Sequence, residues 1–220
     1  MDALKEIDVG RNLLLKHPFT MLVAGSTGSG KTVLIRKLLS DFRHITDFEA
    51  PVRVLWCFGV HQRLYEEPLP GVHLHYVKGF PESVDGCDVI VLDDLQSSAG
   101  DDKRLGDLFT RASHHKQITV IYVVQNLFHQ SKEMRNVSLN CHYLLLLSSR
   151  RDRSQVARLA SQLFPGQGGY FLDAYKKALD RDYGYLLVDL TPSTLEENRL
   201  RTNILPEEYP IIIFRERDGV

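Results

Sequence analysis

The chain has 220 residues, of which 43% are hydrophobic, and its formal net charge is only −1 at pH 7. This length and apolar content suit one α/β domain. No apolar run approaches the ~20 residues of a membrane-spanning helix, so we expect no membrane association. Residues 1–8 carry acids and lack an apolar stretch, so we do not expect a secretory signal.

The small net charge conceals a basic middle of the chain. Residues 103–158 hold 10 Lys and Arg against 3 Asp and Glu, whereas residues 1–102 have a net charge of −5 and residues 159–220 one of −3. A basic segment between acidic flanks favours a polyanionic partner. The alternative is an ordinary solvated surface whose charges scatter in three dimensions.

Short apolar runs alternate with helical stretches, which is typical of a mostly parallel sheet flanked by helices. The expected strands are 19–24, 53–59, 88–93, 118–125 and 143–148, with two more at 183–190 and 211–214. The expected helices are 31–42, 102–114, 153–164 and 170–180. Most of the first five strands are continuous runs of Val, Ile and Leu, as in strands covered on both faces.

No boundary in the sequence indicates a second domain. We therefore predict a single α/β domain over residues 1–220. Residues 11–190 form its core, and residues 191–220 form a C-terminal extension with a last strand. The two late strands are expected to extend one edge of the sheet.

The most informative stretch fits the phosphate-binding loop pattern G-x-x-x-x-G-K-[ST] with no mismatch. Its residues are Gly25, Ser26, Thr27, Gly28, Ser29, Gly30, Lys31 and Thr32. A predicted strand precedes the loop and a predicted helix follows it, so backbone N–H groups and the helix N-terminus can surround phosphate oxygens. Lys31 is placed to reach the β- and γ-phosphates, and the Thr32 hydroxyl to bind Mg²⁺. The bland alternative is a glycine-rich turn without a ligand.

Two adjacent carboxylates follow the apolar strand at 88–93. Ligands of open α/β sheets bind at the carboxyl ends of strands, so we expect Asp93 to hold Mg²⁺ and Asp94 to polarise the attacking water. The alternative is a strand that simply ends in an acidic turn. The third element is Gln125, at the end of strand 118–125, which we expect to touch the γ-phosphate or orient the water; the alternative is a strand terminator.

Arginines follow the strand at 143–148. Arg150 and Arg151 are candidates for an arginine finger supplied to a neighbouring subunit, but they could equally contact DNA phosphates or form a solvated helix start. Lys132 and Arg135 are candidate contacts to DNA phosphates. His114 and His115 are adjacent and therefore face different ways on a helix, so we expect a solvated helix end there and not a metal site.

Several segments, taken together and in order, resemble a known family. They are His17–Thr20, the phosphate loop, Val54–Gly59, Leu108–His115, Val120–Phe128, Arg151–Gln155, Tyr183–Asp189 and Arg199–Asn203. The set is similar to the viral genome-packaging ATPases of the FtsK–HerA superfamily. In particular it resembles the short form in Polinton/Maverick elements and adintoviruses, which is related to poxvirus and giant-virus packaging ATPases. The resemblance runs from about residue 11 to about residue 214. It implies a single P-loop ATPase domain over residues 1–220, of the ASCE or RecA-like α/β class.

The resemblance implies a homo-oligomeric ring that uses ATP and Mg²⁺ to drive double-stranded DNA, without sequence specificity, into a preformed capsid. It implies a capsid vertex or portal protein as partner, and an intracellular location in the infected host, at a nuclear or cytoplasmic assembly site and transiently at the capsid. Lys31, Thr32, Asp93 and Gln125 match the family's positions. Many superfamily members have Glu where Asp94 stands, so the position of the water must differ slightly.

Two other functions remain open at this stage. A P-loop small-molecule kinase would share the loop and sheet, and the arginines at 150–153 could form its phosphate-clamping lid. Adjacent carboxylates and a polar strand end suit water activation better. A nucleotide-stabilised capsid-vertex or scaffold protein would bind the nucleotide without hydrolysing it. Against this alternative, every predicted catalytic position carries a residue suited to catalysis. A regulatory GTPase is less favoured, because no Asn-Lys-x-Asp motif occurs.

Overall fold

A computed structural model describes residues 4–8, 13–50, 52–95, 103–109, 116–125, 137, 140–148 and 153–216. Its strands are β1 (Leu4–Asp8), β2 (Thr20–Ala24), β3 (Val52–Phe58), β4 (Val72–Lys78), β5 (Val89–Asp93), β6 (Thr119–Val124), β7 (Tyr143–Leu147), β8 (Tyr185–Asp189), β9 (Leu200–Thr202) and β10 (Ile212–Glu216). Its α-helices are α1 (Lys31–Ser40), α2 (Phe42–Ile45), α4 (Lys103–Asp107), α7 (Arg153–Leu163) and α8 (Gly168–Ala178). Short 3₁₀ turns cover Arg63–Glu66, Glu196–Asn198 and Pro206–Glu208.

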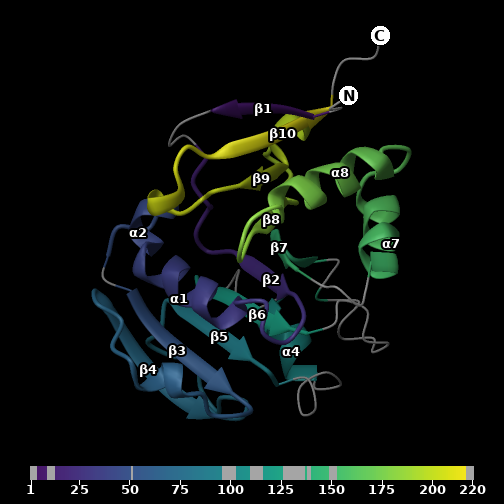
Figure 1. Ribbon diagram of the computed structural model, residues 1–220. Coiled ribbons are helices and arrows are strands. Elements are labelled where there is room, and N and C mark those ends of the chain that lie inside the picture. The colour runs from purple at the N-terminus through teal and green to yellow at the C-terminus, as the bar shows by residue number, and fades with distance from the viewer. Residues whose placement is uncertain are drawn as a thin grey trace.

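All ten strands belong to one sheet, in the order β1-β10-β9-β8-β7-β2-β6-β5-β3-β4. The strands from β7 to β4 in this order are parallel to one another. The remaining four strands add on antiparallel beyond β7. Figure 1 shows the antiparallel strands above and the parallel strands below. The predicted α/β class, with a mostly parallel sheet and C-terminal strands at one edge, is confirmed.

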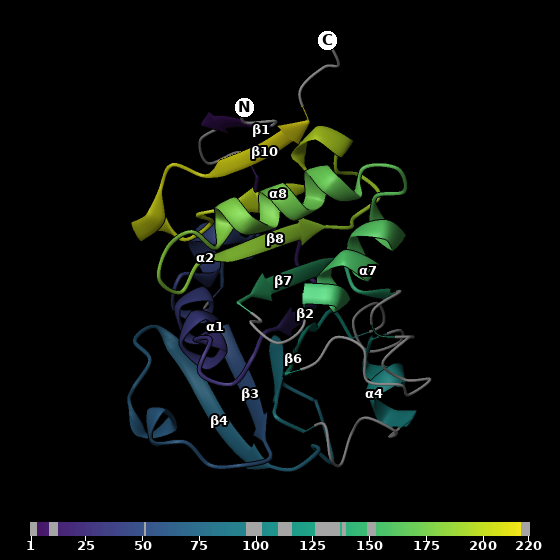
Figure 2. The same cartoon turned by 45° about the vertical axis from the view of Figure 1, so that its right-hand side comes forward.

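Side chains of alternate strand residues build a separate core on each face of the sheet. On one face the strands pack against α1 and α2, through residues such as Ile35, Leu38 and Phe42. On the other face they pack against α4, α7 and α8, through residues such as Leu105 and Phe171. Figure 2 shows α8 lying across β8 with α7 beside it. Burial on both faces explains why the central parallel strands β2, β5, β6 and β7 are composed mainly of apolar residues.

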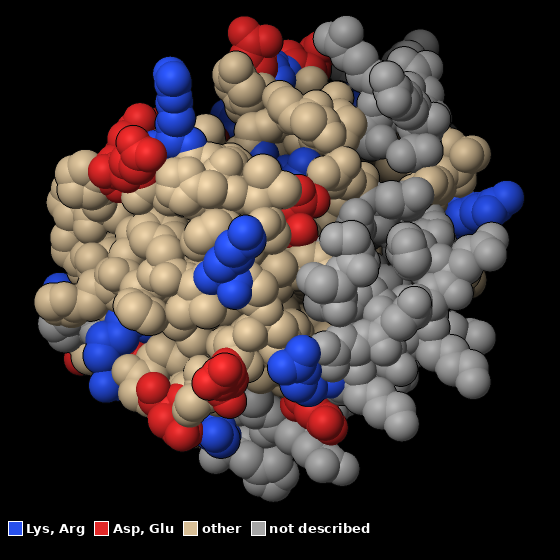
Figure 3. Space-filling view, turned by 90° about the horizontal axis from the view of Figure 1, so that it is seen from below, with Lys and Arg blue, Asp and Glu red and all other residues tan. Residues whose placement is uncertain are grey.

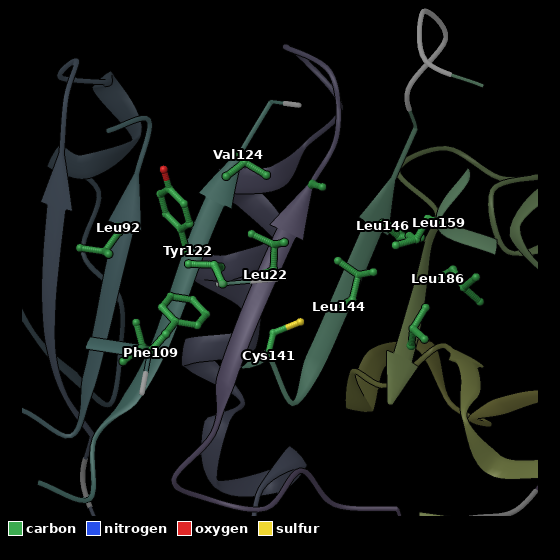
Figure 4. Close-up of a cluster of buried hydrophobic side chains, with 14 of the residues drawn as sticks. Leu22, Leu92, Phe109, Tyr122, Val124, Cys141, Leu144, Leu146, Leu159 and Leu186 are labelled. Carbon is green, nitrogen blue, oxygen red and sulfur yellow. The ribbon is translucent and has the colours of Figure 1, made fainter. Parts of the chain in front are cut away.

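The strands are in register toward a common edge. Leu22 of β2 lies opposite Tyr122 of β6 on one side and Leu144 of β7 on the other, and these side chains point into one layer in Figure 4. Leu92 of β5 continues the row on the far side of Tyr122. Because the strands are parallel and aligned, the residues that follow β2, β5 and β6 meet at the same edge of the sheet.

Most predicted elements are present with shifted ends, and three strands were not predicted. The helix predicted at 31–42 is instead two helices, since α1 ends at Ser40 and Asp41 separates it from α2. The helix predicted at 102–114 is described only over 103–109, where its α-helical part ends at Asp107. β1, β4 and β9 were missed. Among the described helices, none combines the length and the apolar content needed to cross a membrane.

Candidate active site

The phosphate loop lies between β2 and α1 and is fixed by the two strands beside β2. The backbone N–H of Gly25 donates to the carbonyl of Val124 at the end of β6, at 3.4 Å. Both the backbone N–H and the hydroxyl of Ser26 donate to the carbonyl of Ser148, just beyond β7, at 3.1 and 3.0 Å. The first residues of the loop are therefore held in place before any ligand binds.

The loop has the features of an anion site. Gly28 and Gly30 have φ values of 78° and 93°, in a region that residues with a Cβ rarely adopt. Helix α1 begins directly after Gly30, with no side-chain cap and no acidic residue in its first turn, so its N–H groups and partial positive charge face the loop. The buried hydroxyl of Ser29 has no hydrogen-bond partner among the described residues. An anion with several acceptor oxygens would satisfy the N–H groups at the start of α1.

Lys31 currently binds the loop itself. Its ammonium Nζ donates to the carbonyls of Gly25 and Ser26 at 2.8 and 2.9 Å. Burial lowers the pKa of Lys31, and the nearby charges of Asp93 and Asp94 act in the opposite direction. A phosphate in the loop would offer this half-buried cation stronger, charged acceptors than two carbonyls.

Thr32 and Asp93 form a pair of oxygen ligands suited to Mg²⁺. The Thr32 hydroxyl donates to Oδ2 of Asp93 at 3.3 Å. Two ligands at about 2.1 Å from one octahedral ion lie roughly 3 Å apart, so both oxygens can bind the same ion after small movements. The chemistry and the spacing of these two residues therefore fit a magnesium ion beside the phosphate loop.

Tyr65 is a contact of Asp93 that was not predicted. It lies in the 3₁₀ turn after β3, and its hydroxyl donates to Oδ2 of Asp93 at 2.9 Å. Burial, followed by the charge of Asp93, raises the pKa of Tyr65, so the phenol remains a donor. Its ring stacks on Tyr76, whose hydroxyl accepts a bond from the buried Arg36. The carboxylate is thus held in place by a packed aromatic group.

A hydrogen-bonded chain joins the loop to the second carboxylate. The Thr27 hydroxyl donates to Oε1 of Gln125 at 3.1 Å, and Nε2 of Gln125 donates to Oδ1 of Asp94, also at 3.1 Å. This connection exists because β6 lies between β2 and β5, which places Gln125 between the loop and the acids. Asp94 has a φ of 55°, which Asp tolerates better than most residues. A change at the loop can therefore be transmitted to Asp94 through one amide.

These groups line a single pocket of about 440 Å³. Its walls include Lys31, Thr32, Asp93, Asp94 and Gln125, so the structure brings together all the predicted catalytic residues that it describes. Two larger hollows, of about 650 and 610 Å³, lie beside β3 and around His17 and do not include the loop.

Replacing Asp93 with asparagine is expected to raise the melting temperature of the nucleotide-free protein at neutral pH. Burial raises the pKa of Asp93 above its ordinary value, so burying the charged form destabilises the fold at neutral pH. This penalty disappears as the pH falls through the raised pKa to the ordinary one, because the wild-type carboxyl is then protonated. Calorimetry over a pH series should show the difference between variant and wild type shrinking with acidification.

Asp85→Asn serves as the matched control, and its melting temperature is expected to change in the opposite direction. Hydrogen bonds from Lys116 and Ser83 lower the pKa of this exposed carboxyl, so its loss should slightly destabilise the protein at neutral pH. Two results would contradict the idea that the buried charge of Asp93 destabilises the fold. One is a melting temperature of Asp93→Asn below that of wild type at neutral pH. The other is a difference in melting temperature between variant and wild type that does not change with pH.

The predicted arginine finger and DNA contacts lie outside the described residues. These are Arg150, Arg151, Lys132 and Arg135, and the same holds for His114 and His115. Of the ten basic residues in the segment 103–158, the side chains of Arg104, Lys116 and Arg158 are described. Figure 3 shows basic and acidic side chains interspersed on the described part of one face. The expected basic surface thus depends mainly on residues whose side chains are not described.

Similar arrangements of helices and strands occur in solved structures of low sequence identity. The genome packaging NTPase B204 from Sulfolobus turreted icosahedral virus 2 is 13% identical in its complex with AMP, with a TM-score of 0.47 and coverage of 81% of this chain and 96% of that one. The same protein in complex with ATP-γS is 12% identical, with a TM-score of 0.49 and coverage of 80% of this chain and 94% of that one. EssC (ATPases 2 and 3) from Geobacillus thermodenitrificans is 12% identical, with a TM-score of 0.45 and coverage of 91% and 40%.

One sequence family matches part of the chain. No curated protein matches the chain in sequence. Residues 6–58 match the profile of a family described as Poxvirus A32 protein. The matched stretch spans β2, the phosphate loop, α1 and β3, and it ends before the two carboxylates of β5. The similarity to this family therefore includes the elements that build the anion site.

Proposed function

We propose that the chain is an ATPase that moves double-stranded DNA and packages a viral or virus-like genome into a preformed capsid. The observation that carries the proposal is the meeting of the loop, two carboxylates and one amide in a single pocket. An amide between the loop and the acids suits attack by water on a terminal phosphate. The match of residues 6–58 to the Poxvirus A32 profile accords with the resemblance of the sequence to packaging ATPases.

In the proposed mechanism the loop binds the triphosphate through its N–H groups and Lys31. The ammonium group leaves the carbonyls of Gly25 and Ser26 for the β- and γ-phosphate oxygens, where it offsets the charge that develops during transfer. Thr32 and Asp93 hold Mg²⁺, which when bound neutralises phosphate charge. Tyr65 keeps Asp93 oriented toward Thr32.

Asp94 and Gln125 act on the water in this proposal. Asp94 accepts the hydrogen bond that polarises the water, and Nε2 of Gln125 fixes Oδ1 of Asp94 so that the other oxygen faces the site. Loss of the γ-phosphate would alter the contact between Thr27 and Gln125, at 3.1 Å in this state. Because Gln125 directly follows β6, the change would act at the carboxyl end of that strand.

The wider assignment follows from the resemblance to the FtsK–HerA superfamily. Residues 1–220 act as one ATPase unit in a homo-oligomeric ring, with Arg150 or Arg151 reaching the nucleotide of a neighbouring subunit. Lys132 and Arg135 contact DNA phosphates without reading sequence. The ring docks on a capsid vertex or portal protein at an intracellular assembly site in the infected host. Within this proposal the chain is of the type found in Polinton/Maverick elements and adintoviruses.

The proposal is tested by the ATPase rate of wild-type protein with and without linear duplex DNA. We expect DNA to raise the rate several-fold, and the increase to weaken with added salt because phosphate contacts release counterions. A rate that is indifferent to DNA in an assembled sample would contradict the motor function. A phosphorylated small product would favour a kinase, and nucleotide-dependent assembly without turnover would favour a scaffold protein.

A further inference from the structure

Two apolar side chains are exposed beside the phosphate loop. The large hydrophobic residues exposed within the described part of the chain are Leu14, Val33, Val60, Tyr183 and Leu195. Val33 and Tyr183, at 47% and 74% exposure, both line the pocket that contains the loop. Neither is needed to bind phosphate, magnesium or water, so the proposed chemistry does not account for their exposure.

Tyr183 is held over the loop by a tight turn between α8 and β8. The N–H of Gly184 donates to the carbonyl of Arg181 at 3.1 Å. A Cβ on Gly184 would lie 2.3 Å from the carbonyl oxygen of Ala178, so only glycine fits there. Tyr183 itself has a φ of 56°, a conformation that is uncommon for a residue with a bulky side chain. The backbone therefore fixes the position of the ring although the ring is solvent-exposed.

The ring of Tyr183 lies directly against the last glycine of the loop. A Cβ added to Gly30 would be 2.8 Å from Cδ1 of Tyr183. The hydroxyl of Tyr183 forms no hydrogen bond with another described residue. The ring is thus positioned by the turn and by its contact with Gly30, and its outer part is free to contact a ligand.

We propose that Tyr183, together with Val33, forms the platform on which the base of the bound nucleotide stacks. The inference rests on the triphosphate site proposed above and extends it to the base. A nucleobase has an apolar face that stacks well on an aromatic ring, whatever its hydrogen-bonding edge. The platform offers a ring and an aliphatic side chain, so it favours the large purines over pyrimidines and discriminates little between ATP and GTP.

The test compares magnesium complexes of ATP and of inorganic tripolyphosphate, which lacks a base. Tyr183→Asn removes the ring but keeps a residue that tolerates positive φ, and Tyr183→Phe keeps the ring. We expect Tyr183→Asn to weaken ATP binding at least about tenfold and to leave tripolyphosphate binding unchanged. Tyr183→Phe should behave as wild type. Equal ATP affinity in Tyr183→Asn and wild type, or an equal loss for both ligands, would overturn the proposal.

A fluorescent variant gives an independent measurement. The chain has one tryptophan, Trp56, which is fully buried, so Tyr183→Trp adds a single exposed indole. We expect ATP to change the fluorescence of this indole and tripolyphosphate to leave it nearly unchanged; the same response to both would overturn the proposal. Wild-type protein that binds neither ligand would instead refute the triphosphate site itself, so the two failures are distinguishable.

Discussion

The Lys31→Ala variant is expected to lose ATP hydrolysis almost completely, with a fall of at least about 10²–10³ in turnover. Lys31 is a half-buried cation in the loop, positioned by the carbonyls of Gly25 and Ser26. No other described cation lines the pocket, so alanine leaves the developing phosphate charge without this partner. Release of inorganic phosphate from ATP, measured at saturating nucleotide, checks the prediction.

Lys37→Ala is the matched control for this experiment. Lys37 lies on the same helix, but its side chain is exposed and pairs with Glu207 at 2.6 Å. Such surface pairs contribute about 0–1 kcal/mol, so this variant should hydrolyse ATP as wild type does. Circular dichroism should show that both variants are folded. A Lys31→Ala variant that is folded and hydrolyses ATP at the wild-type rate would contradict the site assignment.

Asp94→Asn is expected to separate nucleotide binding from hydrolysis. Asparagine tolerates the φ of 55° at this position, and its Oδ1 can still accept the hydrogen bond from Gln125. The variant therefore loses the negative charge while keeping the local geometry. Without the charge the attacking water is poorly polarised, and we expect turnover to fall by about 10²–10⁴ with little loss of ATP affinity.

Single-turnover hydrolysis and equilibrium ATP binding, measured on the same preparation, check this second prediction. Asp94→Glu should retain part of the activity, since it keeps a carboxylate one methylene longer. Near-normal turnover in Asp94→Asn would show that another group activates the water. A loss of binding as large as the loss of turnover would place Asp94 among the binding residues.

The sequence was sufficient to predict which of the described polar residues meet in the pocket. The loop is a contiguous motif. Asp93 ends β5 and Gln125 directly follows β6, and the continuous apolar composition of both strands makes them easy to recognise. Such strands are parallel and buried on both faces, so their carboxyl ends meet at one edge. That rule alone places Lys31, Asp94 and Gln125 in one pocket, as the structure does.

The supporting residues could not be predicted because they depend on the order of the strands. Tyr65 reaches Asp93 only because β3 pairs with β5, which sets Phe58 opposite Asp93. Tyr183 reaches Gly30 because a turn brings it over the loop. Strand β4 was missed because it lies at the edge of the sheet and alternates half-buried with exposed residues, with histidines at 73 and 75 in place of a continuous apolar run.

Displacement of a third strand from linear duplex DNA tests the central claim most directly, since a motor that moves along the duplex strips off an oligonucleotide bound in its groove. We predict that the wild-type protein displaces the third strand when ATP is present. With ATP-γS in place of ATP, or with the Lys31→Ala variant in place of the wild-type protein, no displacement is expected. Stimulation of ATP hydrolysis by DNA without any displacement, in an assembled sample, would contradict translocation.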